Sequence, residues 1–155
     1  MLVQLNRSDQ NRAFAPNSTA VPVPGLDRQR TDPVVVVLGQ PGRVAALGPH
    51  LPAGWTVRLA ADPADVRPDE IVLISGAREP DVRAARAVLS ARTRVVALVD
   101  EDARAELVAA VLTGGADACV RGGQPAILAS HLVACRRRQL TDRWLNVAAA
   151  VPAAD

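Results

Sequence analysis

The sequence predicts an α/β domain, a doubly wound three-layer sandwich around a five-stranded parallel sheet. Two observations carry this prediction. Short apolar runs rich in β-branched residues alternate with segments of helical periodicity, and the connections between them are short. Alternation of this kind joins parallel strands through right-handed crossovers and places helices on both faces of the sheet. With 155 residues, the chain is long enough for one such domain and its core.

The first half of the chain supplies two strands. Residues 34–38 (VVVVL) form a continuous β-branched run, which is typical of a strand buried on both faces. Residues 44–51 repeat valine and leucine near helical spacing and predict a short first helix. Residues 56–60 alternate between polar and apolar side chains, as an edge strand with one solvated face does. Residues 62–66 leave room only for a stub of helix.

The second half repeats the pattern three times. Residues 71–74 predict a buried strand, and Pro80 then begins a helix. Residues 95–99 predict the fourth strand, which leads into another helix, and residues 118–120 predict the last strand before a helix that begins at Pro125. Each helix has an apolar stripe that is expected to face inward. The stripes comprise Val82, Ala85, Val88 and Leu89, then Leu107, Val108, Val111 and Leu112, and finally Ile127, Leu128, Leu132 and Cys135.

The pattern also divides the chain into three parts. Residues 1–32 have no sustained period and predict a disordered leader. Residues 33–140 form the domain, and residues 141–155 are expected to be a helical extension and tail. Trp144 lies in this extension among other apolar side chains, which either fold back onto the domain or serve a partner interface.

Composition limits the function classes. The formal net charge is only +2, all 18 basic residues are arginine, and aromatic residues make up 2% of the chain, so we expect no direct nucleic-acid binding. No apolar stretch approaches the roughly 20 residues of a membrane span, and the N-terminus lacks the apolar run of a signal peptide. We therefore expect a cytoplasmic protein whose two cysteines, Cys119 and Cys135, are reduced.

Two segments resemble the receiver domain of bacterial response regulators. The stretch from Leu112 to Val120 (LTGGADACV) is similar to that family's helix end, Gly-Ala-Asp and short apolar strand, and residues 69–74 resemble the approach to its phosphoacceptor. The resemblance covers about residues 33–140. It implies the flavodoxin-like strand order 2-1-3-4-5, with the active site at the carboxyl ends of the first and third strands.

The catalytic residues of that family are missing at the matching positions. The acidic pair that holds Mg²⁺ falls on Gly39 and Gln40, and the phosphoaccepting aspartate falls on Ser75. The chain has no lysine to match the family's lysine. The resemblance therefore implies an atypical, degenerate receiver that is not an enzyme and holds no metal ion or cofactor. Its vestigial phosphorylation pocket is expected at Gly39, Gln40, Ser75, Val99, Arg121 and Gly122.

Three features allow a functional and a structural interpretation. Residues 100–102 (DED) are either a relocated metal cluster or, as we favour, the acidic start of a helix. Residues 39–42 are favoured as a plain turn over a phosphate cradle, because Pro41 lacks an amide donor. Residues 136–138 (RRR) are favoured as a solvated helix face over a grip on an acidic partner.

The leading hypothesis is a phosphorylation-independent pseudo-receiver that regulates signal transduction or transcription through protein contact. The resemblance implies a homodimer or partner face built from the fourth helix, the last strand and the last helix. We expect this face to contain Ala105, Val108, Leu112, Arg121, Leu132 and Arg136.

The alternative hypothesis is a sensor of a small anionic ligand. In this interpretation the loops at the carboxyl ends of the strands line a pocket that replaced the phosphorylation site. Arg78 and Arg121 would contact the anion.

Overall fold

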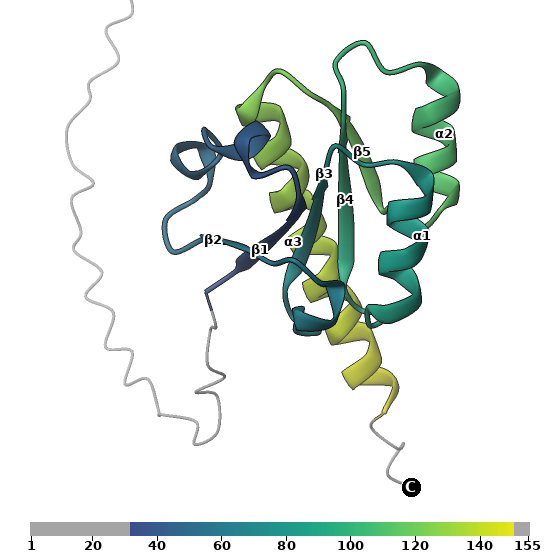
Figure 1. Ribbon diagram of the computed structural model, residues 1–155. Coiled ribbons are helices and arrows are strands. Elements are labelled where there is room, and N and C mark those ends of the chain that lie inside the picture. Colours follow the sequence, from purple (N-terminus) through teal and green to yellow (C-terminus); the bar gives the residue numbers. More distant parts are fainter. Residues whose placement is uncertain (1–31, 151–155) are drawn as a thin grey trace, which may run out of the picture. The chain divides into compact units, whose positions relative to one another are not determined.

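The computed structural model describes residues 32–150 and confirms the predicted fold class. Five parallel strands form one sheet in the order β2-β1-β3-β4-β5 (Figure 1). The leader expected at residues 1–32 lies, apart from Asp32, outside the described residues, as do residues 151–155 of the expected tail. The strands are β1 (Val34–Gly39), β2 (Thr56–Leu59), β3 (Ile71–Ser75), β4 (Arg94–Val99) and β5 (Ala118–Arg121).

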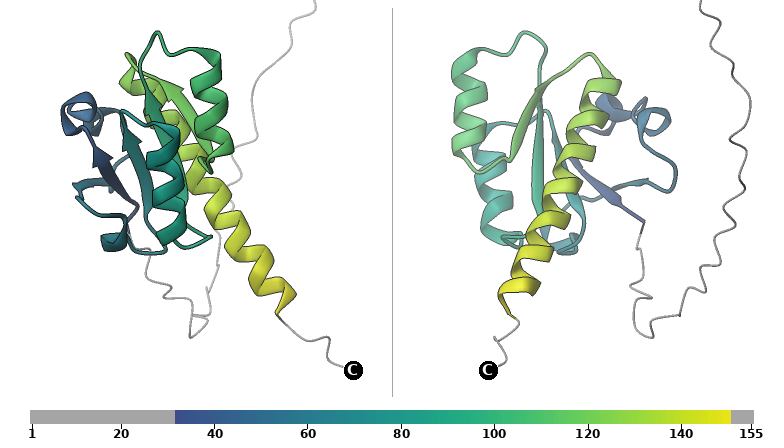
Figure 2. Two further views of the ribbon diagram at one scale, coloured as in Figure 1. Left: turned by 45° about the vertical axis from the view of Figure 1, so that its right-hand side comes forward. Right: turned by 180° about the vertical axis from the view of Figure 1, so that it is seen from behind.

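Three α-helices cover the sheet from both sides. They are α1 (Glu79–Val88), α2 (Ala105–Thr113) and α3 (Pro125–Ala149). Helices α1 and α2 lie on one face and α3 lies on the other, so the described domain has the predicted three layers (Figures 1 and 2).

The prediction of a first α-helix is wrong. Residues 44–51 contain no α-helix, because the chain there forms two separate 3₁₀ turns, η1 (Pro41–Val44) and η2 (Gly48–His50). Proline and glycine at 41–42 and 48–49 interrupt the segment, and neither residue supports a helix interior. The stub expected after β2 is also a 3₁₀ turn, η3 (Pro63–Asp65).

Two apolar layers hold the helices to the sheet. Alternation along the strands sends Val35, Leu73 and Leu98 toward α3, where Leu132 is fully buried among them. Val72 and its neighbours on the opposite face pack against α1 and α2. Full burial of each such side chain stabilises the fold by about 1.5–3 kcal/mol.

Asp117 anchors the amino ends of β4 and β5. Its carboxylate accepts hydrogen bonds from the Val95 amide at 2.8 Å, from Arg86 at 2.6 Å and from Arg94 at 2.7 Å. Arg86 also donates to the carbonyl oxygen of Gly115 at 2.7 Å. Gly115 has φ +117°, and a Cβ there would meet Arg86 Cγ at 2.6 Å. The Gly-Ala-Asp segment therefore has a structural role, which is to join α1 to two strands.

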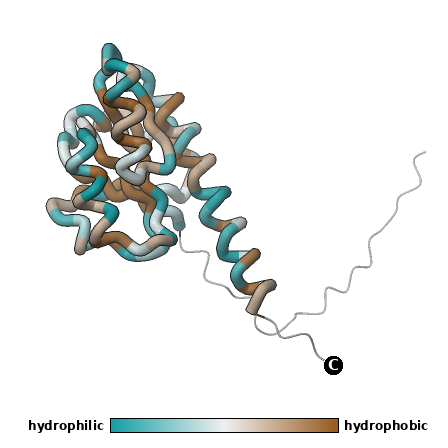
Figure 3. The backbone as a smooth tube through the Cα atoms, turned by 90° about the vertical axis from the view of Figure 1, so that its right-hand side faces the viewer, coloured by the Kyte–Doolittle hydropathy of each residue, from teal (hydrophilic) through white to brown (hydrophobic). Residues whose placement is uncertain are grey.

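Helix α3 continues without a break through the predicted extension as far as Ala149. It passes the amino end of β4, where Asp142 forms an ion pair with Arg94. Its last turns project beyond the sheet instead of folding back over it (Figure 2). Hydrophobic and hydrophilic residues alternate along these turns (Figure 3), and the large apolar side chains exposed there are Leu140, Trp144, Leu145 and Val147.

The two cysteines pack in different layers of the domain and form no disulfide. Burial raises the pKa of both the Cys119 and the Cys135 thiol, so both side chains behave as small apolar groups. Within residues 32–150, none of the helices combines the length and apolar character that a membrane span requires.

Candidate functional site

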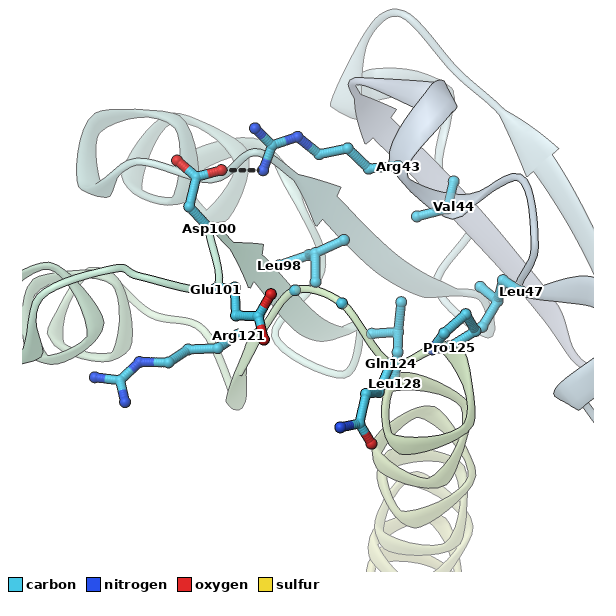
Figure 4. A pocket seen from close by; sticks show the side chains of 12 residues that line it. Arg43, Val44, Leu47, Leu98, Asp100, Glu101, Arg121, Gln124, Pro125 and Leu128 are labelled. Atoms are coloured by element: carbon cyan, nitrogen blue, oxygen red, sulfur yellow. Dashed lines mark hydrogen bonds and ion pairs between the residues drawn. The ribbon is translucent and has the colours of Figure 1, made fainter.

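Two hollows adjoin the carboxyl end of the sheet, the end at which doubly wound proteins bind ligands. The larger, about 840 Å³, is lined by the ends of β1, β3 and β4 and by one side of α1. We call it the switch-point groove, because β1 and β3 are the neighbouring strands whose connections leave in opposite directions. The smaller, about 310 Å³, lies between η1 and the start of α3 (Figure 4). Arg43 and Asp100 line both hollows.

Gly39 ends β1 in a conformation that excludes a side chain. Its φ is +87°, and a Cβ at this position would lie 2.4 Å from the carbonyl oxygen of Ser75. Ser75 pairs with Gly39 in the sheet register, so this close approach is built into the β1–β3 pairing. Gly39 matches the first residue of the acidic pair in receiver domains. This position therefore cannot carry a carboxylate without a change in the backbone.

Gln40 stands at the second position and belongs to a polar chain that spans the strand ends. Its backbone amide donates to the Ser75 carbonyl oxygen at 3.2 Å, and its side-chain oxygen accepts from Arg43 Nε at 2.7 Å. Arg43 in turn forms an ion pair with Asp100, which follows β4 (Figure 4). Because β1 and β4 flank β3, the Gln40–Arg43–Asp100 chain bridges the carboxyl end of β3.

Ser75 lines the groove at the end of β3, but its hydroxyl belongs to the core. Alternation along β3 places the side chain on the face shared with Leu73 and Leu98, which α3 covers. The residue is almost fully buried, and its hydroxyl has no hydrogen-bond partner among the described residues. Its burial and its direction are both unfavourable for nucleophilic or phosphoaccepting chemistry.

The remaining positions of the expected vestigial pocket separate into two groups. Val99 is buried in the layer under α1 and α2, and it lines the switch-point groove with Gly39, Gln40 and Ser75. Gly122 and Arg121 line the smaller hollow instead. Figure 4 shows the guanidinium of Arg121 directed away from Arg43 and Asp100, so the structure does not bring Arg121 to the groove.

Arg78 lies at the groove, and a neighbouring carboxylate engages it. Its Nε donates to Asp81 Oδ2 at 3.0 Å, and this hydrogen bond raises the pKa of Arg78. The two expected anion contacts, Arg78 and Arg121, therefore lie at different hollows, and the one at the groove is already paired.

The acidic run at 100–102 is distributed among protein contacts. Asp100 pairs with Arg43, and the Glu101 carboxylate lies against Gly123, where a Cβ would approach Glu101 Oε2 to 3.1 Å. Within the described range, no three His, Cys, Asp or Glu residues are grouped so that they could hold a metal ion.

Two residues of the expected contact face are buried. Leu132 is fully buried in the core, as its place in the inward stripe predicts. Arg136 is 9% exposed and donates inward, to the Asp69 carbonyl oxygen at 3.0 Å and to Gln139 Oε1 at 2.7 Å. Of the other positions, Ala105, Leu112 and Arg121 are exposed and Val108 is half-buried.

Val88, Leu112 and Ile127, which the stripes place inward, are exposed instead. Val88 lines the switch-point groove, because the connection between β2 and β3 supplies only η3 where a longer helix would cover this side of α1. A pattern within one helix cannot reveal how much of that helix a neighbouring segment covers.

The chain matches no model of a known protein family, and no curated protein matches it. What the structure shows is a five-stranded, all-parallel sheet in the order 2-1-3-4-5 with alternating helices, consistent with a flavodoxin-like or receiver-like fold.

Proposed function

We propose that this chain is a phosphorylation-independent, receiver-like signalling module that acts through protein contact in signal transduction or transcription control. The observation that carries the proposal is the carboxyl end of β3. Gly39 has no space for a carboxylate, and the Gln40–Arg43–Asp100 chain bridges the strand end. Phosphoryl transfer to an aspartate with Mg²⁺ needs acidic oxygens there to hold the cation.

The contact face in this proposal consists of the exposed residues Ala105, Leu112 and Arg121 and the half-buried Val108. Leu112 is 42% exposed on α2 and is the largest apolar side chain of the set. Apolar groups at the centre of an interface contribute most to affinity when water is excluded around them. The proposed partner is a second copy of the chain.

Sedimentation velocity of wild type and two matched variants tests this face. Leu112→Glu introduces a charge at the proposed interface, whereas Val57→Glu introduces the same charge on β2, at the opposite edge of the sheet. We expect wild type and Val57→Glu to dimerise and Leu112→Glu to remain monomeric. A wild type that stays monomeric at all concentrations contradicts the homodimer, and equal loss of dimer in both variants contradicts the face.

The groove supports a second function, the sensing of a small ligand. Its volume, about 840 Å³, lies within the range of about 300–1,000 Å³ that is usual for small-molecule sites. A ligand that binds only the folded chain raises its melting temperature, so thermal shift against small molecules tests this role. If no small molecule raises the melting temperature, the result counts against the sensing role.

A further inference from the structure

We propose that the switch-point groove binds a small, largely apolar and uncharged molecule that carries a hydrogen-bond acceptor. The inference rests on the ligand-sensor function proposed above and is independent of the contact function. It differs from the anionic ligand expected from the sequence, and the reasons lie in the charges, amides and walls of the groove.

The charged side chains that line the groove neutralise one another. Arg43 is paired with Asp100, and Arg78 is paired with Asp81, and all four residues line the same groove. An incoming anion would have to compete with a carboxylate already in contact with each guanidinium. The groove therefore has no net charge with which to select an anion.

The backbone amides at the strand ends are also engaged. Gly76 and Ala77 each donate to the Leu98 carbonyl oxygen at 2.9 Å, Gln40 donates to Ser75, and Arg78 donates to Asp81 Oδ2 at 3.2 Å. Phosphate sites in proteins use several amides that converge on the anion. These four amides, which border the groove, are not available for that purpose.

Beside these paired charges, much of the groove wall is apolar. Ala84 and Val88 line it from α1, Pro63 lines it from η3, and Leu107 lines it from α2. Val88 is 57% exposed, so a ligand that covers it would bury apolar surface and gain about 25 cal/mol per Å². These walls favour an apolar body.

The Gln40 side chain offers a hydrogen-bond donor at the groove. The side-chain oxygen of Gln40 accepts from Arg43, and its Nε2 has no acceptor among the described residues. A carbonyl or ether oxygen on the ligand would complete this amide's hydrogen bonding. The preferred ligand class therefore combines an apolar body with a hydrogen-bond acceptor.

Fluorescence titration with Nile red, an uncharged apolar dye that has a carbonyl acceptor, tests the proposal. The variant Ala84→Trp fills the groove from an exposed position on α1, and Ala87→Trp places the same side chain on α1 outside the groove. We expect saturable binding to wild type, a rise in Kd of about tenfold or more in Ala84→Trp, and little change in Ala87→Trp. Equal binding by the two variants overturns the proposal, because the dye would then bind elsewhere.

Inorganic phosphate separates the ligand class from the sensor role. It should neither displace Nile red from wild type nor raise the melting temperature, whereas Asp100→Asn, which releases Arg43, should gain a phosphate-dependent rise. Displacement of the dye by phosphate from wild type would overturn the uncharged class and leave the sensor role standing. Failure of both probes to bind wild type would overturn the ligand class and the sensor role together.

Discussion

Ser75 carries a buried hydroxyl without a hydrogen-bond partner among the described residues. An unpaired buried hydroxyl costs about 1–3 kcal/mol in proteins. We therefore expect Ser75→Ala to leave the free energy of unfolding unchanged or to raise it by up to about 1 kcal/mol, since a small void offsets part of the gain.

Urea denaturation of Ser75→Ala measures this change. Ser130→Ala is the control, because the Ser130 hydroxyl is exposed and donates to the Ala126 carbonyl oxygen at 2.9 Å. A clear loss of stability in Ser75→Ala would show that the hydroxyl is satisfied by a partner such as a bound water.

Single residues also show where inference from sequence stops. The glycine at 39 is visible in the sequence, but its contact with the Ser75 carbonyl depends on the β1–β3 register. Arg136 follows Cys135 of the inward stripe, yet arginines are rarely buried, so the sequence favours an exposed position. In the structure, the Asp69 carbonyl oxygen before β3 and the Gln139 side-chain oxygen in α3 accept its hydrogen bonds. Burial lowers the pKa of Arg136, and the positive charge of Arg143 lowers it further.

At the scale of elements, Glu70 holds the edge strand β2 to the start of β3. Arg58 of β2 donates to Glu70 Oε1 at 2.9 Å and to Oε2 at 2.5 Å, and the Arg67 amide donates to Oε2 at 2.8 Å. Burial alone would raise the pKa of Glu70, but these hydrogen bonds and the charges of Arg58 and Arg67 hold it below its ordinary value. The ionised carboxylate therefore stabilises the fold.

This lowered pKa predicts a pH-dependent stability. The contribution of Glu70 is complete above the unfolded-state pKa of about 4.3 and is lost as pH falls through the lower folded-state value. We expect Glu70→Gln to unfold more easily at pH 7 by about 1–3 kcal/mol. The difference from wild type should shrink as the pH is lowered from about 5 toward 3.

Thermal denaturation across this pH range, with Glu106→Gln as an exposed control on α2, checks the prediction. A difference between Glu70→Gln and wild type that stays constant down to pH 3 would contradict it.

Some elements can be predicted from the sequence and others cannot, depending on whether a local pattern determines them. The strands are recognisable because short, continuous runs of valine and isoleucine are typical of a sheet covered on both faces, as in β1 and β3. The first helix fails because hydrophobic spacing does not distinguish an α-helix from 3₁₀ turns that also bury Val44 and Leu47. The groove beside α1 exists because η3 is short. It depends on how α1 and η3 pack together, so the sequence of either segment alone does not predict it.

At the scale of the described domain, the two ends of the sheet have different roles. The amino end is fixed by Asp117 and by the hydrogen bonds of Arg136 and Gln139. The carboxyl end holds both hollows, and its turns contain glycines with positive φ such as Gly39 and Gly76. The resemblance to receivers leads us to expect a pocket at this end of the sheet, but the pairing of the charges there is visible only in the folded structure.

Intact mass spectrometry after incubation with acetyl phosphate and Mg²⁺ tests the central proposal most directly. A receiver domain that retains its phosphoaccepting aspartate serves as the positive control in the same reaction. Because Gly39 and Gln40 provide no carboxylate for the cation and Ser75 is buried, we expect the mass of this chain to stay unchanged while the control gains a phosphoryl group. Stoichiometric, Mg²⁺-dependent addition of a phosphoryl group to this chain would contradict the account.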